Sequence, residues 1–345
     1  MKVDAMTAPL PLSEMQELAS AAERSGFSGL VLTEGGRTAY LSIAAGALVT
    51  ERLEWATGIA VAFPRSPMVT AEIGWELAEA SQGRFRLGLG TQVRAHIVRR
   101  YGVEFDRPGP RLQEYVEAVR ACFAAFAGEA ALDFHGEFYE LTLLNDQWSP
   151  GPIDVPPPPI DIAAVNPWML RMAGRVAEGV HVHPLGQSGY LRTTVQQELA
   201  AGAAAAGRQV TDLARIVPCF AIVGDGDSER EPYRRTTRTQ LAFYGSTPNY
   251  AFIFEQAGFE GTTERIRERQ KAGDIEGMAA VVDDDIVANF AVESTWDGLA
   301  DALVDRYDGL ADRIVLYLAG MAWGRDREAF ERMGAVAAEV AARTT

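Results

Sequence analysis

The amino-acid sequence predicts an α/β fold in which eight strands alternate with helices to form a (β/α)8 TIM barrel. Short apolar runs of strand length alternate with longer stretches in which apolar residues recur at helical spacing. Residues 53–92 contain a complete predicted strand-helix-strand unit, which requires a parallel strand pair with a right-handed crossover. The connections are short, as in a parallel sheet or barrel, and an open doubly wound sheet is the alternative.

The first strand of this unit and its helix have clear boundary signals. Residues 55–62 form an apolar run, and the turn residues Phe63-Pro64-Arg65 close it. Ser66 can cap the helix that follows, and Pro67 suits its first turn. The helix should end at Ser81-Gln82-Gly83, where small and polar residues stop the apolar periodicity.

The second strand of the unit, at residues 85–89, ends in small residues. Gly88 and Gly90 suggest a dinucleotide fingerprint, but Val93 stands where that motif needs its third glycine. Glycines at the end of a strand also occur where something flat must approach the backbone closely. We therefore expect a close approach of this kind rather than a Rossmann site.

The other elements follow in order along the chain. Two strands precede the central unit and four follow it, at residues 2–5, 29–33, 160–165, 179–182, 216–223 and 313–318. Helices are expected between them, at residues 11–25, 38–49, 111–127, 166–177, before Gly207, and at 296–307 and 325–343. A polar loop is expected from Gly90 to Pro110.

We expect a single domain over residues 1–345, since an α/β barrel commonly has this length. Two segments interrupt the alternation. The first, at about 128–159, contains a predicted hairpin around His135 and a polyproline connector. The second, at about 225–289, is a predicted helical insertion.

Composition and charge exclude several classes of protein. A formal net charge of -15 argues against a nucleic-acid partner, because phosphate backbones require a basic face. No apolar stretch approaches the roughly 20 residues that span a bilayer, and the first residues lack the apolar core of a signal peptide. We therefore expect a cytoplasmic protein with no membrane partner. Cys122 and Cys219 lack Cys-x-x-Cys spacing and are expected to be buried thiols.

The predicted carboxyl ends of the strands, where barrels place their chemistry, carry few acids, bases or nucleophiles. No Gly-x-Ser-x-Gly elbow and no Walker loop is present. His181 and His183 lie two apart on one strand and could bind zinc in a metal-dependent barrel hydrolase, but no third ligand is evident, so we expect no metal. A cofactor that carries the reaction would explain this composition, and a non-catalytic binding barrel is a further alternative.

Ordered motifs along most of the chain resemble those of one family. The first half contains ATGIAVAFPRSPMVTAE, SQGRFRLGLGTQVRAHIVRRYG and RPGPRLQEYVEAVRA. The second half contains AAVNPWMLRMAGRVAEGVHVHP and FYGSTPNYAFIFEQAGF. Together they resemble the bacterial luciferase-like superfamily of flavin-dependent and coenzyme F420-dependent oxidoreductases, and most of all a branch presumed to use the deazaflavin.

This resemblance implies a luciferase-like barrel that transfers a hydride between coenzyme F420 and a small organic substrate. An FMN-dependent monooxygenase that uses oxygen is the alternative within the same fold. A homodimer is expected on the same basis. Aromatic residues of the insertion indicate an apolar or aromatic substrate lining, namely Phe243, Tyr244, Tyr250 and Phe254.

The resemblance also implies where the cofactor binds. It places a bulge with a non-prolyl cis peptide at Gly58-Ile59, and the polar edge of the ring near the residues that follow the fourth strand. The cofactor-binding residues expected on this basis are Gly58, Ile59, Ala60, Thr91, Gln92, His96, Ala164, Val165, Asn166 and His183. The catalytic residues expected are Glu34, Gln92 and His96.

Several assignments have an alternative. Gly58 could be an ordinary strand glycine, and His96 could be solvated or have a structural role only. Members of the family often have an acid followed by histidine, but Gly35 follows Glu34 here, so their proton route does not transfer. Glu34 could act as the acid or base itself, or accept hydrogen bonds from backbone amides. Asn166 could simply cap a helix. The arginines at residues 94–111, together with those at residues 230–238, could bind an anionic cofactor tail or form surface salt bridges.

Overall fold

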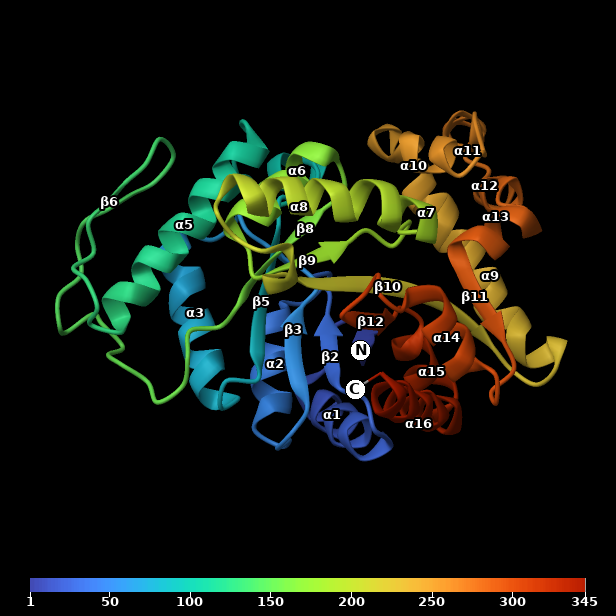
Figure 1. Ribbon diagram of the computed structural model, residues 1–345, viewed down its shortest axis with the longest axis horizontal. Coiled ribbons are helices and arrows are strands. Elements are labelled where there is room, and N and C mark those ends of the chain that lie inside the picture. The colour runs from blue at the N-terminus through green and yellow to red at the C-terminus, as the bar shows by residue number, and fades with distance from the viewer. Residues whose placement is uncertain (345) are drawn as a thin grey trace.

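A closed parallel barrel lies at the centre of the computed structural model, which describes residues 1–344 (Figure 1). Its strands are β1 (Lys2–Thr7), β2 (Gly29–Leu32), β3 (Glu54–Thr57), β5 (Phe85–Gly90), β8 (Ile160–Ala164), β9 (Gly179–Val182), β10 (Ala214–Val223) and β12 (Arg313–Leu316). β1 pairs with both β2 and β12, and β9 pairs with both β8 and β10, so the sheet closes on itself. The predicted (β/α)8 TIM barrel is confirmed.

Two short strands add to this sheet. β4 (Ala60–Val61) pairs with β5, and β11 (Ala291–Ser294) pairs with the last residues of β10. The single strand predicted at 55–62 was therefore wrong in detail, because β3 and β4 are separated at Gly58-Ile59, where the peptide bond is cis. β11 was missed because four residues directly after a helical insertion are too short to show strand periodicity.

Helices surround the barrel on its outer side (Figure 1). They are α1 (Leu12–Ser25), α2 (Ala39–Ala47), α3 (Pro67–Ala80), α5 (Pro108–Phe126), α6 (Pro167–Val176), α7 (Ser188–Tyr190), α8 (Gln196–Ala205), α14 (Leu299–Tyr307), α15 (Ala319–Arg325) and α16 (Arg327–Arg343). Ser66 caps α3 as predicted, since its side chain accepts a hydrogen bond from the Val69 amide. None of the helices within residues 1–344 is long and apolar enough to cross a membrane.

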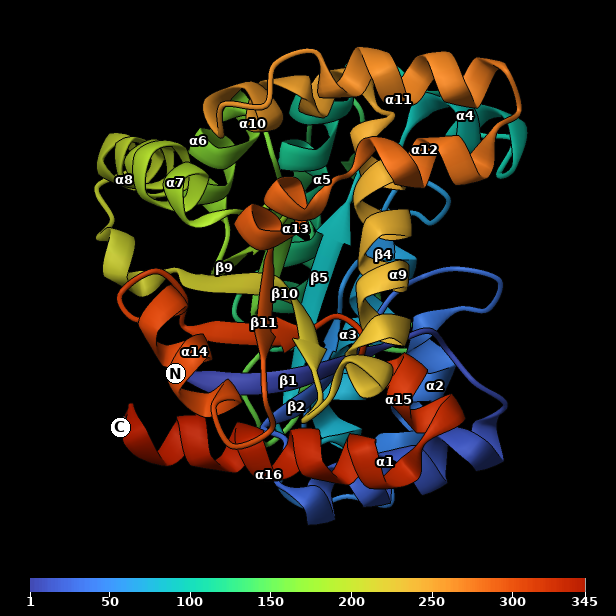
Figure 2. The same cartoon turned by 90° about the vertical axis from the view of Figure 1, so that its right-hand side faces the viewer.

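The two segments that interrupt the alternation lie at opposite ends of the molecule (Figure 1). The hairpin predicted in the first is present, with strands β6 (Phe134–His135) and β7 (Glu140–Leu141). The insertion contains α9 (Asp227–Gly245), α10 (Ala251–Gln256), α11 (Thr262–Lys271), α12 (Ile275–Val281) and α13 (Asp284–Phe290). Figure 2 shows α9 running along one side of the barrel toward α10, α11 and α12.

Two other expectations concern smaller features. The polar loop predicted between Gly90 and Pro110 is wrong in part, because it contains the short helix α4 (Arg94–Arg99). Six residues without a side-chain cap give little signal in a sequence. Cys122 and Cys219 are buried free thiols, as predicted.

Candidate functional site

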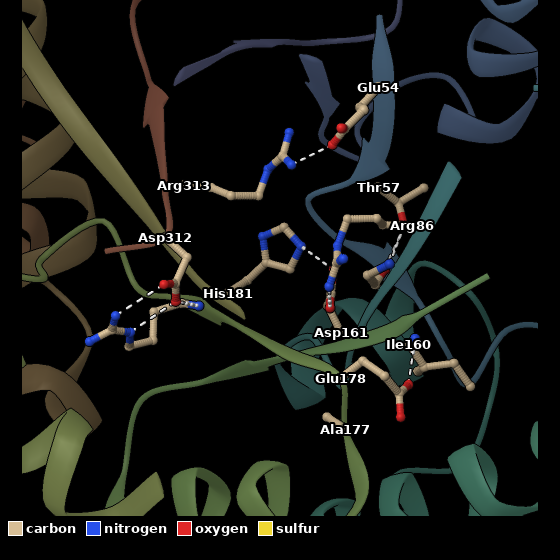
Figure 3. Close-up of polar contacts among 12 residues, drawn as sticks. Glu54, Thr57, Arg86, Ile160, Asp161, Ala177, Glu178, His181, Asp312 and Arg313 are labelled. Carbon is tan, nitrogen blue, oxygen red and sulfur yellow. Dashed lines mark hydrogen bonds and ion pairs between the residues drawn. The ribbon is translucent and has the colours of Figure 1, made fainter. Parts of the chain in front are cut away.

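Inward-facing side chains fill the amino-terminal half of the barrel with paired charges (Figure 3). Arg86 donates to both carboxylate oxygens of Asp161, with Nε–Oδ2 and Nη2–Oδ1 distances of 2.8 and 2.6 Å. Arg313 makes the same two-point contact with Asp4 and also pairs with Glu54. Asp4 and Asp161 are almost completely buried. This layer is an ion-pair core and is closed to ligands.

The next inward-facing layer is apolar and neutral. Since alternate residues of a strand share a face, it follows the charged layer by two positions along each strand. It consists of His181 and an apolar cluster of Met6, Val31, Ala56, Ile216 and Val315. Burial lowers the pKa of His181 to about 4, although the Asp161 carboxylate, 3.9 Å from its Nε2 atom, opposes the shift. The imidazole is therefore neutral near pH 7.

At the mouth of the barrel, β3 and β5 present backbone instead of bulky side chains. A Cβ atom on Gly58 would lie 2.2 Å from Val31 Cγ1, and one on Gly90 would lie 2.8 Å from Ile59 Cδ1. Gly58 and Ile59 are both partly exposed, and their peptide bond is cis, as the family resemblance implied. The two glycines thus leave the Ile59 side chain and bare backbone as the surface of the mouth on this side.

Glu34 lies at the mouth and is held by two neighbours. Its Oε2 atom accepts hydrogen bonds from the Val61 amide at 2.7 Å and from Arg65 at 3.1 Å. The second oxygen pairs with Arg65 as well, and only 4% of the Glu34 side chain is exposed. This is the geometry of a structural acceptor for backbone amides, and a catalytic role for Glu34 stays a prediction. The sequence indicates Arg65 only as a turn residue, so its ion pair with Glu34 was not predicted.

The three residues predicted after the fourth strand occupy an exposed segment. Thr91 donates to the Gln92 carbonyl at 3.1 Å, and Gln92 Oε1 accepts from the Val93 amide at 3.0 Å. Gln92 has a φ of 56°, a left-handed conformation that turns the chain sharply after β5. His96 lies on α4 and is exposed. Their predicted contacts with a cofactor stay predictions.

The segment from Ala164 to Asn166 connects β8 to α6. Asn166 is the N-cap of α6, and its side-chain oxygen accepts a hydrogen bond from the Met169 amide at 3.0 Å. The Val165 carbonyl accepts from the hydroxyl of Tyr190. The helix predicted to begin at Asn166 therefore begins one residue later. Capping accounts for Asn166, and its contact with a cofactor phosphate stays a prediction.

His183 follows β9 and lies among aromatic rings. Its ring centroid is 4.2 Å from that of Tyr250 and 4.8 Å from that of Tyr244, both of which come from the insertion. Phe254 was expected in the same lining, but it is 1% exposed and packs on Phe290 inside the insertion, so that expectation was wrong. Its place in an apolar run gave no indication that it belongs to the insertion's own core.

Most of the arginines expected to receive an anionic tail already have partners. Arg94, Arg100 and Arg111 donate to backbone carbonyls, and Arg107 pairs with Asp106 and Glu137. Exposed Arg99 has no ion-pair partner within the described part of the chain. Arg37, which was not singled out from the sequence, is also exposed and has no ion-pair partner among residues 1–344.

A large open pocket lies outside the barrel and is not a good candidate. It has a volume of about 820 Å³ and lies between α9, α13, β11 and α14. Two of its arginines are neutralised, since Arg234 pairs with Glu293 and Arg238 with Asp284. Residues 1–344 contain no group of three histidine, cysteine or carboxylate side chains placed to hold a metal ion.

The model of the luciferase-like monooxygenase family matches residues 2–313. An uncharacterized protein of Mycobacterium tuberculosis is 38% identical over 309 residues, which cover 89% of this chain and 90% of the relative. A 5,10-methylenetetrahydromethanopterin reductase of Archaeoglobus fulgidus is 26% identical over 324 residues, covering 91% of each chain.

A solved structure with a similar fold is the coenzyme F420 dependent tetrahydromethanopterin reductase of Methanopyrus kandleri. Its TM-score is 0.78 at 18% sequence identity, and the match covers 100% of this chain and 99% of that one. At this identity the likeness describes the fold alone. Because the family model matches residues 2–313, most of the chain, the protein belongs to the luciferase-like monooxygenase family.

Proposed function

We propose that the protein is an oxidoreductase that transfers a hydride between coenzyme F420 and a small organic substrate. The observation that carries this proposal is the construction of the mouth. Gly58 and Gly90 bring no side chain to the mouth, Ile59 is partly exposed there, and the layer beneath is apolar and neutral. Such a surface suits a planar ring, and a bound deazaflavin would supply the two-electron chemistry that these side chains lack.

The residues proposed to bind the ring are those expected from the sequence. Gly58, Ile59 and Ala60 would support one face of it, and Thr91, Gln92 and His96 would border its polar edge. The backbone of residues 164–166 at the amino end of α6 favours an anion such as the cofactor phosphate. His183 would line the opposite side of the mouth, where the protein groups packed around its ring lower the pKa of the imidazole.

The charge pattern favours a cofactor with a long acidic tail over FMN. Arg100 donates to the Gly35 carbonyl and so joins α4 to the loop that follows β2. Arg99 and Arg37 are exposed on these two adjoining segments. We propose that they attract the tail of coenzyme F420, since a single phosphate would leave much of this charge unused.

A homodimer and a cytoplasmic location are also part of this proposal. Leu41 and Leu48 of the α2 segment are 60% and 72% exposed, and a homodimer that covered this face would bury them. The mass of the protein in solution tests the homodimer. A cytoplasmic location also stays a proposal.

The proposed reaction can be tested against its alternative by supplying each reduced cofactor. Without oxygen, the protein should return reduced deazaflavin to its oxidised form when a panel of small enones, imines and aldehydes is added. Oxygen uptake with reduced FMN should equal that of a protein-free solution. Protein-dependent oxygen uptake with reduced FMN would instead establish the monooxygenase alternative.

A further inference from the structure

Four aromatic side chains from three parts of the fold meet at the mouth, opposite Gly58. His183 follows β9, Tyr317 follows β12, and Tyr244 and Tyr250 belong to the insertion. His183 packs on both insertion tyrosines, and the Tyr244 and Tyr317 rings lie 6.4 Å apart, edge to face. All four side chains are partly exposed. We call them the tyrosine cluster.

The position of this cluster follows from strand alternation. His181 points inward, since its ring would meet Cβ atoms placed on both Gly58 and Gly88. His183 is two residues further along β9 and so faces the same interior, one layer nearer the mouth. Tyr317 follows inward-facing Val315 in the same way. The cluster therefore faces the proposed ring surface across the barrel.

The hydroxyl groups of Tyr244 and Tyr317 are hydrogen-bonded to each other. The pair holds two hydrogens and uses one of them in this bond, so the second O–H is free to donate. Burial raises the pKa of both tyrosines, which keeps both hydrogens in place near neutral pH. Tyr244 and Tyr317 are both partly exposed residues.

The rest of the cluster is neutral as well. The Leu185 amide donates to His183 Nδ1 at 3.2 Å, so the ring proton is on Nε2 and the imidazole is uncharged. Within residues 1–344, no member of the cluster takes part in an ion pair. A carboxylate or ammonium ligand would lose water here without gaining an opposite charge. An uncharged ligand that accepts one hydrogen bond does not have this desolvation cost.

We propose that the tyrosine cluster is the substrate-recognition surface of this enzyme, and that it selects uncharged carbonyl compounds by donating a hydrogen bond from the Tyr244–Tyr317 pair to the carbonyl oxygen. The aromatic rings of His183 and Tyr250 provide the apolar wall beside this donor. This inference rests on the proposed function only in identifying the bound carbonyl compound as a substrate. The recognition itself can be measured without turnover.

The test uses para-dimethylaminocinnamaldehyde, whose absorption moves to longer wavelength when its carbonyl oxygen accepts a hydrogen bond. The wild type should bind it with such a shift. The double variant Tyr244→Phe/Tyr317→Phe, which keeps both rings, should lose the shift and bind about tenfold more weakly. The matched control Tyr101→Phe, outside the cluster, should behave as the wild type. The corresponding cinnamate, which is anionic, should bind less tightly than the aldehyde.

Three results would overturn the inference: no shift with the wild type, an unchanged shift in the double variant, or tighter binding of the cinnamate. If the double variant fails to fold by circular dichroism, the comparison of aldehyde with cinnamate, which uses only the wild type, still tests the inference. Titration with coenzyme F420 is a separate measurement. Its failure would refute the proposed function, whereas absence of the aldehyde shift in the wild type would refute only the recognition surface.

Discussion

Arg86→Met should lower the free energy of unfolding by about 3–5 kcal/mol, because it leaves the Asp161 carboxylate charged and unpaired inside the barrel. Asp161 is completely buried, and both its oxygens accept hydrogen bonds from the Arg86 guanidinium. Methionine replaces the volume of the arginine stem but none of its donors. Urea unfolding of the variant and the wild type, followed by circular dichroism, measures the difference.

Two further variants test whether the loss of stability comes from the buried charge or from the removal of any ion pair. Arg171→Met removes a pair with Glu198 whose side chains are 45% and 23% exposed, and it should cost less than about 1 kcal/mol. Adding Asp161→Leu to Arg86→Met removes the orphaned charge and should recover part of the loss. A loss for Arg86→Met as small as that for Arg171→Met would contradict the ion-pair core described above.

Gly58→Val should weaken binding of coenzyme F420 at least about 100-fold, which corresponds to about 2.7 kcal/mol. A Cβ atom at this position would lie 2.2 Å from Cγ1 of Val31, which is 1% exposed and cannot move into free space. The strand end and the adjacent Ile59 must shift to make room, so the proposed ring surface loses its shape. Fluorescence titration of the deazaflavin reports the affinity.

Gly35→Ala is the matched control for this variant. Gly35 also lies at the mouth, but a Cβ atom there would have no neighbour within 4 Å. It should bind the cofactor as the wild type does. If both variants bind with wild-type affinity while remaining folded, the ring does not rest on Gly58 and Ile59, and the site must be sought elsewhere at the mouth.

The barrel could be predicted because its strands are buried and its helices amphipathic. Both properties are visible in the sequence as apolar runs and as helical spacing. The Ser66 cap and the hairpin around His135 were predicted from local residue types, which is also where their physical causes lie. The break at Gly58-Ile59 was implied by family resemblance alone, since its residues look like an ordinary strand.

Features made by residues distant in the chain could not be predicted. Arg86 and Asp161 are 75 residues apart, and Tyr244 and Tyr317 are 73 apart, so neither pair has a sequence spacing that marks it. Arg65 holds Glu34 only because the barrel brings the ends of β2 and β4 together. The glycines at the ends of β3 and β5 allowed one side of the mouth to be predicted. The tyrosine cluster on the other side could not be predicted, because its position depends on how the insertion packs against the barrel.

If the mouth binds a deazaflavin with an acidic tail, titration of the wild type with coenzyme F420 and with FMN should distinguish the two cofactors. Coenzyme F420 should bind at least about tenfold more tightly than FMN, a difference of about 1.4 kcal/mol. The preference should shrink between about 0.01 M and about 0.15 M salt, because exposed Arg37 and Arg99 would be screened. Tighter binding of FMN, or a preference for coenzyme F420 that does not respond to salt, would contradict the account.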